Sequence, residues 1–345
     1  MQKKFKRHRA TGLFDHDLRL SKLSKLGDPL ERLAKGVDFE QFRQLLEDHL
    51  IKPTKGKGGR PPYDYVLMFK ILILQRYYNL SDDQIEYQIN DRLSFMRFLG
   101  LTMADDVPDS KTVWAFTEQL TDLELVDTLF NLFTSKLSEL GLIVNEGKIV
   151  DASFVEAPRQ RNSREENQKI KDGQGDQLWQ DTASKKSQKD IDARWTKKNN
   201  VNFFGYKNHC KVDGGSKLIE TYTVTDASVH DSQALPSLLN KEQDSGQTLH
   251  ADSAYHGQDE VIDQVEMEDQ VHEKGFRNNP LSEAQRASNK EKSSTRARVE
   301  HVFGFMENSM GTMFYRKIGK KRAETVIGLM NLTYNMFRML QLQKI

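Results

Sequence analysis

The run KIVDASFVEAP, residues 148–158, sets an aspartate in the middle of a stretch that otherwise has the composition of a buried β-strand. Ile149, Val150 and Phe154 are side chains of the types enriched in strands. An unpaired carboxylate is costly to bury, so Asp151 needs a cation beside it if the strand is real. The rest of the sequence has to supply that cation or contradict the strand.

Helical patterns precede this strand. Apolar residues at helical spacing predict a helix before residue 50, and KPTKGKGGRPP, residues 52–62, predicts a flexible basic linker. Residues 63–78 and 81–92 predict helices, the second capped by Ser81, and a further helix should begin at Asp109 or Ser110. We expect only a short turn around SFMRFLG. Short helices joined by tight turns are typical of a helix-turn-helix DNA module and also of bundles without that role.

Strand patterns follow residue 147. NFFGYKNHCKVD and KLIETYTVTDAS alternate and are joined at Asp213-Gly214-Gly215, which predicts a β-hairpin. QTLHADSAYHG predicts another short strand. Residues 159–198 are polar and basic with little apolar periodicity, and we expect a mobile or partly disordered insertion there. Together these segments predict a mixed α/β domain behind an all-α region.

The net charge of +1 hides a strong asymmetry along the chain. Residues 1–60 hold 15 Lys and Arg against 8 Asp and Glu, and residues 158–211 hold 13 against 7. Residues 212–273 hold 2 against 14. The two basic blocks could face nucleic-acid phosphates or could be solvated surface.

The remaining composition narrows the class of protein. Cys210 is the sole cysteine, so an internal disulfide and a four-cysteine zinc site are excluded, and a reducing cytoplasm is the expected compartment. The basic N-terminus has no apolar signal-peptide core after it. The most apolar run, residues 65–78, is interrupted by charge and is too short for a membrane span.

Two further carboxylates are candidates to act with Asp151. Asp252 directly follows a predicted strand, and Glu300 lies on a predicted helix one turn after Arg296. Three carboxylates from two strand ends and a helix are the hard oxygen ligands that two Mg²⁺ ions need for phosphodiester chemistry. Each also has a structural reading: Asp151 could cap a turn, Asp252 could form an Asx-turn with Ala254, and Glu300 could pair with Arg296.

Several of these segments together resemble a known family. KIVDASFVEAP, WTKKNNVNFFGYKNHCKVD, TVTDASVHDS, LHADSAYHG and RARVEHVFGFM are similar to the DDE transposases of bacterial insertion sequences. Specifically, they resemble the insertion-sequence-five family, within the larger group named after insertion sequence four. GRPPYDYVLMFKILILQRYYNLSDDQIEYQINDRLSFMRFLGL resembles the N-terminal region of that family, and the likeness runs in order over roughly residues 20–340.

The resemblance implies a ribonuclease-H-like catalytic core in residues 146–345, with the insertion at about 159–198. Residues 1–62 would be a basic arm, helix and linker, and residues 63–145 a helical region for DNA binding or dimerisation. Asp151, Asp252 and Glu300 would be the catalytic, metal-binding residues for two Mg²⁺ ions, with Mn²⁺ as a substitute.

The family motif around the third acid is tyrosine, two residues, arginine, three residues, glutamate, six residues, lysine. Arg296 and Glu300 fit this spacing, whereas Ser293 and Glu307 replace the tyrosine and the lysine. Arg298, Arg316 or Lys317 could replace the missing phosphate contact of the lysine. The further residues expected to face DNA are listed here: Arg60, Trp195, Lys197, Lys198, Tyr206, Lys207, His209, Arg296 and Arg298.

The implied function is that of an enzyme that binds the inverted-repeat ends of its own element, cleaves there and joins the 3′ hydroxyls to target DNA. Its partner would be double-stranded DNA, held by a homodimer or larger assembly in the bacterial cytoplasm at the nucleoid. Two alternatives are a nuclease with the same core but no strand transfer, and a DNA-binding regulator derived from a transposase.

Overall fold

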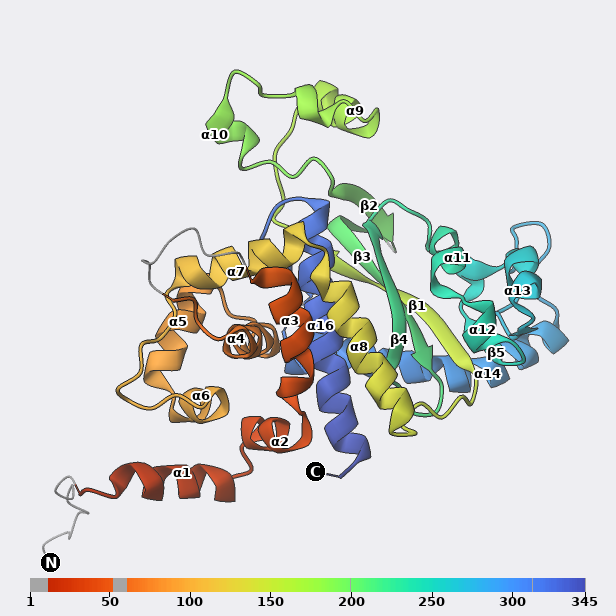
Figure 1. Ribbon diagram of the computed structural model, residues 1–345. Helices are drawn as coiled ribbons and strands as arrows, with labels where there is room; N and C mark the ends of the chain where they lie inside the picture. Colours follow the sequence, from red (N-terminus) through yellow and green to blue (C-terminus); the bar gives the residue numbers. More distant parts are fainter. Residues whose placement is uncertain (1–11, 52–60, 199, 312, 345) are drawn as a thin grey trace, which may run out of the picture.

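The computed structural model describes residues 12–51, 61–198, 200–311 and 313–344 (Figure 1). Arg60 and most of the predicted linker, residues 52–60, lie outside these ranges. Helices make up the N-terminal part. They are α1 (Asp15–Lys25), α2 (Pro29–Gly36), the 3₁₀ turn η1 (Phe39–Phe42), α3 (Arg43–Leu50), α4 (Tyr65–Tyr77), α5 (Asp82–Asp91), α6 (Leu93–Leu99), α7 (Ser110–Asp122) and α8 (Leu125–Glu139).

The helix boundaries follow capping chemistry. Ser81 forms a capping box with Gln84 at the start of α5, and the Asp109 side chain accepts the Thr112 N–H at the start of α7, as predicted. The prediction of only a short turn around SFMRFLG is wrong, because these residues form helix α6. Its apolar side chains are buried and Gly100 closes it in the left-handed conformation. Within the described ranges, no helix combines the length and the apolar character that crossing a membrane requires.

A six-stranded mixed sheet forms the second part of the molecule. Its strands are β1 (Lys148–Glu156), β2 (Arg194–Lys198), β3 (Val201–Asp213), β4 (Ile219–Asp226), β5 (Thr248–Ala251) and β6 (Glu268–Asp269). Across the sheet, β4 pairs antiparallel with β3, β3 antiparallel with β1, β1 parallel with β5, and β5 parallel with β6. β2 extends the β3 edge through residues 201–205. Three antiparallel strands followed by two parallel ones, with β1 in the centre, is the ribonuclease-H-like order.

Helices cover both faces of this sheet (Figure 1). The helical elements after β4 are short turns and helices followed by the C-terminal helices, and they are divided between the two faces. These are η3 (Asp231–Ala234), α11 (Leu235–Leu238), α12 (Lys241–Asp244), η4 (Ser253–Tyr255), α13 (Asp259–Val265), α14 (Glu283–Arg296), η5 (Ala297–Val299), α15 (Glu300–Gly304), the π-helical turn η6 (Phe305–Ser309) and α16 (Lys320–Leu342). Val150 packs with α11, β5 and α13 in a small core on one face.

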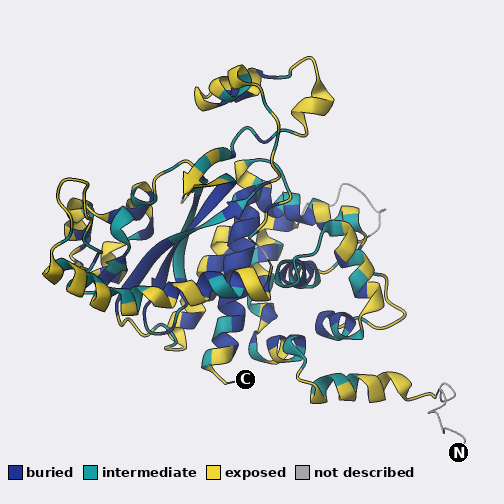
Figure 2. Ribbon diagram, turned by 180° about the vertical axis from the view of Figure 1, so that it is seen from behind, coloured by how far each residue is buried: buried dark blue, intermediate teal, exposed yellow. Residues whose placement is uncertain are grey.

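The larger core lies on the other face and continues into the N-terminal helices. It joins α2, α4, α7 and α8 to β1, β3 and α16. Helix α16 is buried over most of its length between the helical region and the sheet (Figure 2). The predicted boundary at residue 145 therefore separates helical from sheet-forming sequence, while both parts share one core.

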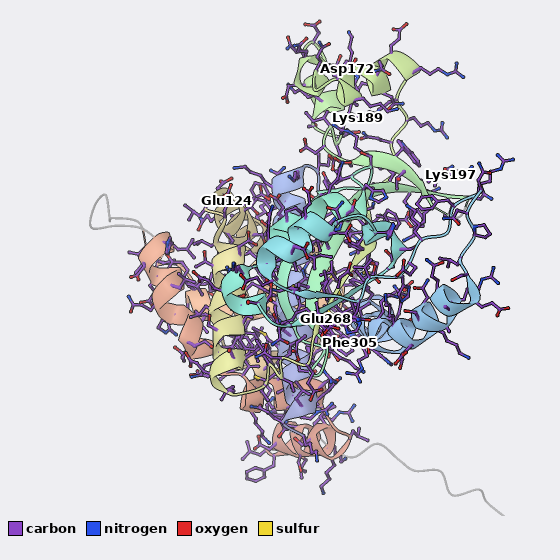
Figure 3. All side chains as sticks on the ribbon, turned by 90° about the vertical axis from the view of Figure 1, so that its right-hand side faces the viewer. Glu124, Asp172, Lys189, Lys197, Glu268 and Phe305 are labelled. Carbon is purple, nitrogen blue, oxygen red and sulfur yellow. The ribbon has the colours of Figure 1, made fainter. Side chains whose placement is uncertain are left out.

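The segment expected to be a mobile insertion forms local structure. It contains α9 (Arg164–Lys171), the 3₁₀ turn η2 (Gly175–Gln177) and α10 (Ala183–Lys186), and it projects from the body beyond β2 (Figures 1 and 2). A capping box of Ser163 and Glu166 starts α9, and Glu166 also accepts the Trp179 indole N–H and binds Lys185. The segment lacks an apolar pattern, and polar contacts hold its local structure together instead. Lys189 and Asp172 mark this arm in Figure 3.

Candidate active site

Adjacent parallel strands bring the first two candidate acids together. β1 and β5 pair up to Val150 and Ala251, so Asp151 and Asp252 follow at the same level on neighbouring strands. Asp151 is 8 % exposed, and its Oδ1 accepts the N–H of Ala152 at 2.8 Å. Asp252 accepts the N–H of Ala254 at 2.8 Å, which is the Asx-turn that the structural reading predicted. Asp151 lies within β1 and caps no turn, so its structural reading is wrong, but both backbone bonds fix the direction of a carboxylate and leave its second oxygen available for other contacts.

Arg296 connects the third acid to the first. The guanidinium Nη1 lies 3.0 Å from Asp151 Oδ2, and Nη2 lies 3.2 Å from Glu300 Oε1. Arg296 ends α14 and Glu300 begins α15, with the buried Val299 of η5 packed between them against β1. The cation that the strand required is therefore Arg296.

The pKa of Asp151 is set mainly by burial, with a smaller effect of the neighbouring carboxylates. Burial is the main cause that raises its pKa, to about 6, and the charges of Asp252 and Glu300 raise it further. The Ala152 N–H and Arg296 act in the opposite direction. One guanidinium thus compensates only part of the charge of three carboxylates, which leaves the site short of positive charge.

The donor set suits a hard divalent cation, because all three side chains offer carboxylate oxygens. In the described conformation, however, the Arg296 guanidinium stands between Asp151 and Glu300. Among the residues that the structure describes, no three His, Cys, Asp or Glu side chains are placed to hold a metal ion together. A metal could use these three ligands only after Arg296 leaves Asp151 and Glu300.

Two of the residues expected to face DNA do not lie at the surface. Tyr206 and His209 are both 0 % exposed. The Tyr206 hydroxyl donates to Asp190, and His209 Nε2 lies 2.8 Å from Thr225 Oγ1. Both faces of β3 are covered from Phe204 to Asp213, so the polar residues there are buried as well as the apolar ones.

Lys207 is also unsuited to a phosphate contact in this conformation. It is 7 % exposed, and its ammonium binds Asp231 at 2.8 Å and the Val229 carbonyl at 2.7 Å. Its charge is satisfied inside the protein. The basic block of residues 158–211 is therefore partly neutralised by the acidic block that follows it.

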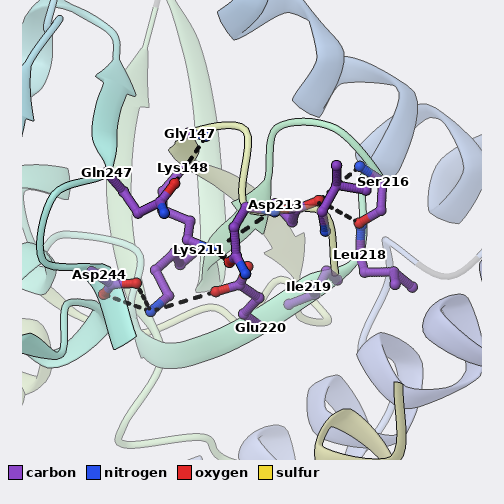
Figure 4. Close-up of polar contacts among 12 residues, drawn as sticks. Gly147, Lys148, Lys211, Asp213, Ser216, Leu218, Ile219, Glu220, Asp244 and Gln247 are labelled. Atoms are coloured by element: carbon purple, nitrogen blue, oxygen red, sulfur yellow. Dashed lines mark hydrogen bonds and ion pairs between the residues drawn. The ribbon is translucent and has the colours of Figure 1, made fainter. Parts of the chain in front are cut away.

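The same pairing recurs deeper in the sheet (Figure 4). Lys211 is fully buried and binds both carboxylate oxygens of Asp244, while the buried Lys148 lies 2.5 Å from Glu220. Asp213 accepts N–H groups from the loop before β1 and from the β3–β4 turn. Satisfied buried charges such as these fix one register, since any slip would leave a charge unpaired.

Other candidates remain accessible. Lys197 and Lys198 are exposed on β2, where Lys197 is labelled in Figure 3, and Trp195 is 42 % exposed. Arg298 is exposed but donates to the Gly214 carbonyl at 2.8 Å. Ser293, at the position of the family tyrosine, donates to the Asn289 carbonyl.

His209 predicts a specific loss of stability in acid. Burial lowers its pKa to about 4, Asp231 raises it and Lys207 lowers it. The unfolded chain would bind the proton near pH 6.5, so the free energy of unfolding should fall as the pH drops from about 6.5 to 4, by about 2 kcal/mol at pH 5. His209→Gln keeps a partner for Thr225 without titrating.

Denaturant unfolding at pH 7.5 and pH 5 checks this expectation. The wild type should lose about 2 kcal/mol more than the variant between the two values. Equal losses in both proteins would show that His209 is not buried in its neutral form.

A ribonuclease-H-like sheet with acids on the central strand, after the neighbouring parallel strand and on a C-terminal helix defines the DDE class of DNA-processing enzymes. Residues 144–336 match the family described as Transposase DDE domain, and residues 18–119 match the family described as Transposase domain (DUF772). The chain belongs to the DDE transposase family and is a DNA-cleaving and strand-transferring enzyme. Transposases of this family use divalent metal ions.

One solved structure was also found to be similar. It is described as the cryo-EM structure of the piggyBac transposase synaptic complex with hairpin DNA. The match covers 93 % of this chain and 76 % of that chain, with 12 % sequence identity and a TM-score of 0.44.

Proposed function

We propose that this transposase, of the insertion-sequence-five type, binds the terminal inverted repeats of its own element, cleaves there and joins the 3′ hydroxyls to target DNA. Asp151, Asp252 and Glu300 would hold two Mg²⁺ ions, or Mn²⁺ in their place. The observation that carries the proposal is the register of β1 and β5, which sets Asp151 beside Asp252 while Arg296 links Asp151 to Glu300. A homodimer or larger assembly would hold two DNA ends, at the nucleoid of a bacterial cytoplasm.

The residues of the chain have separate tasks in this scheme. The backbone N–H groups of Ala152 and Ala254 hold the Asp151 and Asp252 carboxylates in place. Arg296 balances charge while the site is empty, and on DNA binding it would turn from Asp151 and Glu300 towards a phosphate. Metal ions held by these carboxylates would activate the attacking oxygen and stabilise the departing 3′ oxygen.

Arg296 has a natural second partner in this scheme. A guanidinium offers planar paired donors that match a phosphate as well as a carboxylate. Arg296 is part buried and lies beside the partly exposed Glu300, so a DNA strand over the site would reach it. Arg296 would thus bind either the two carboxylates or a DNA phosphate, but not both. Metal ions would then bind the carboxylates only when DNA is bound.

Short duplexes with the repeats that flank the reading frame test the function. With Mg²⁺ and a target plasmid, we expect cleavage at the repeat ends and joined products, and neither with EDTA. A duplex with a scrambled repeat is the control. Cleavage without joining would instead favour the nuclease, and binding without cleavage would favour the regulator.

A further inference from the structure

A cavity of about 360 Å³ lies where the helical region meets the segment that leads into α16. Its walls come from the end of α4, the starts of α5 and α7, and residues 314–317. Four cationic side chains and two aromatic rings line it: Arg76, Lys111, Arg316, Lys317, Trp114 and Phe314. Asp82 and Asp83 are the carboxylates in its lining, so cations outnumber anions. It shares no residue with the site around Asp151.

Two of the cations each have a buried nitrogen without a hydrogen-bond partner. Arg76 Nε and Lys317 Nζ are buried, yet neither has a hydrogen-bond partner among the described residues. Burial lowers the pKa of both groups, that of Arg76 to about 10. The charge of Arg316 lowers the pKa of Arg76 further and the charge of Arg76 lowers that of Lys317, while Asp82 raises both. A buried cationic nitrogen without a hydrogen bond is costly, and a bound anion would satisfy it.

The nearby acids Glu118 and Asp82 already accept hydrogen bonds from other side chains. Glu118 lies 4.0 Å from Lys317 Nζ, beyond hydrogen-bond range, and its two oxygens are bound by Arg322 at 2.6–2.9 Å. Asp82 accepts the side-chain N–H of Gln75 at 2.6 Å. The cavity therefore has donors to spare and few acceptors, which is the requirement of an anion site.

The aromatic rings add a second kind of contact. Trp114 is 48 % exposed and Phe314 is 42 % exposed, although both line the cavity. Arg316 lies over the Phe314 ring and donates to Asn79, which holds its guanidinium at the wall. Exposed rings beside unpaired cations are the combination that binds a base and its phosphate in a single strand.

We propose that this cavity binds a phosphodiester of a DNA strand through Arg76 and Lys317, with the neighbouring nucleoside against Trp114 and Phe314. The assignment rests on the proposed function, because it makes the cavity part of the surface that holds the element's DNA. It adds a strand contact away from the carboxylates, contributed jointly by the helical region and the segment before α16.

Lys317→Met is the decisive variant. It should raise the melting temperature of the free protein, because it removes a buried ammonium that has no hydrogen-bond partner and only a 4.0 Å ion pair with Glu118. It should also lower affinity for an end duplex roughly ten- to hundredfold and make the slope of log affinity against log salt shallower by about one unit. Lys320→Met, half-exposed and outside the cavity, removes the same charge and should change affinity less than about twofold.

Inorganic phosphate, compared with chloride at equal ionic strength, separates a free anion from a DNA strand. We expect millimolar phosphate to raise the melting temperature of the wild type but not of Lys317→Met. Phosphate stabilisation with unchanged DNA affinity in Lys317→Met would mean a small-anion site and overturn the proposal. Equal affinity losses in both lysine variants, or a lower melting temperature of Lys317→Met, would overturn it as well.

The cavity and the proposed function can fail separately. If the wild type cleaves its ends and Lys317→Met binds them equally well, only the cavity assignment is wrong. If the wild type binds no end duplex, the proposed function fails and the DNA assignment fails with it. In that second case, phosphate stabilisation that depends on Lys317 would still identify an anion site.

Discussion

Asp151→Asn should abolish cleavage of element ends, with a loss of at least about 10³-fold, while affinity for the ends persists in Ca²⁺. The amide keeps the size of the side chain and can still accept the Ala152 N–H, but it removes the charge that a hard divalent cation needs. Because Asp151 is buried among like charges, the variant should be at least as stable as the wild type. Gel-based cleavage, duplex binding and thermal unfolding measure the three quantities.

Asp252→Asn and Glu300→Gln are the matched variants. Ligands of one metal site act as a unit, so the three losses should be similar and should not add in combination. Metal-dependent thermal shifts on the DNA complex give a readout that does not depend on turnover. A folded Asp151→Asn protein that cleaves at close to the wild-type rate would remove the carboxylate assignment and leave only DNA binding.

Gly205→Ala should unfold the sheet region. Gly205 has a φ of +148°, and a Cβ there would strike the Val155 carbonyl oxygen and approach Ala157 N to 2.7 Å. Both are backbone atoms at the end of the central strand β1, and Ala227 also donates to the Gly205 carbonyl, so these atoms cannot shift without breaking backbone hydrogen bonds. We expect a loss of at least about 3 kcal/mol from strain and overlap together.

Gly173→Ala is the control for this variant. Its φ of +74° also favours glycine, but a Cβ there meets nothing within 4 Å. Strain alone should cost about 1 kcal/mol. The denaturant midpoints of the two variants separate the cost of atomic overlap from that of backbone strain. Equal midpoints would mean that β1 and β3 leave room for a Cβ at Gly205.

The strands and most helices could be predicted because their signals are local. Ser81 and Asp109 cap helices with their own side chains, and the glycines after Asp213 favour the turn of a hairpin. The helix at SFMRFLG was missed because its length is short and its buried side chains find partners only in the tertiary fold. Local propensity is a weak guide where packing decides.

The sequence indicated which residues form the candidate site, but it indicated few of the contacts between them. The place of Arg296 one turn before Glu300 could be seen in the sequence, but its bond to Asp151 crosses 145 residues. Lys207 and His209 looked like surface residues because a polar residue in a strand usually marks a solvent face. Their burial depends on acids and helices that come later in the chain, which no local pattern reveals.

Helix α16 makes the fold depend on the order of synthesis. On a ribosome the helices of residues 65–139 emerge long before residues 320–342, yet α16 packs against α2, α4, α7, α8 and β4. Until it arrives, the nascent chain exposes an apolar groove and must remain unfinished or be held by a chaperone. A frameshift or stop codon upstream of residue 320 should therefore yield a polypeptide that proteases remove, rather than a shortened protein that competes with the intact enzyme for DNA ends.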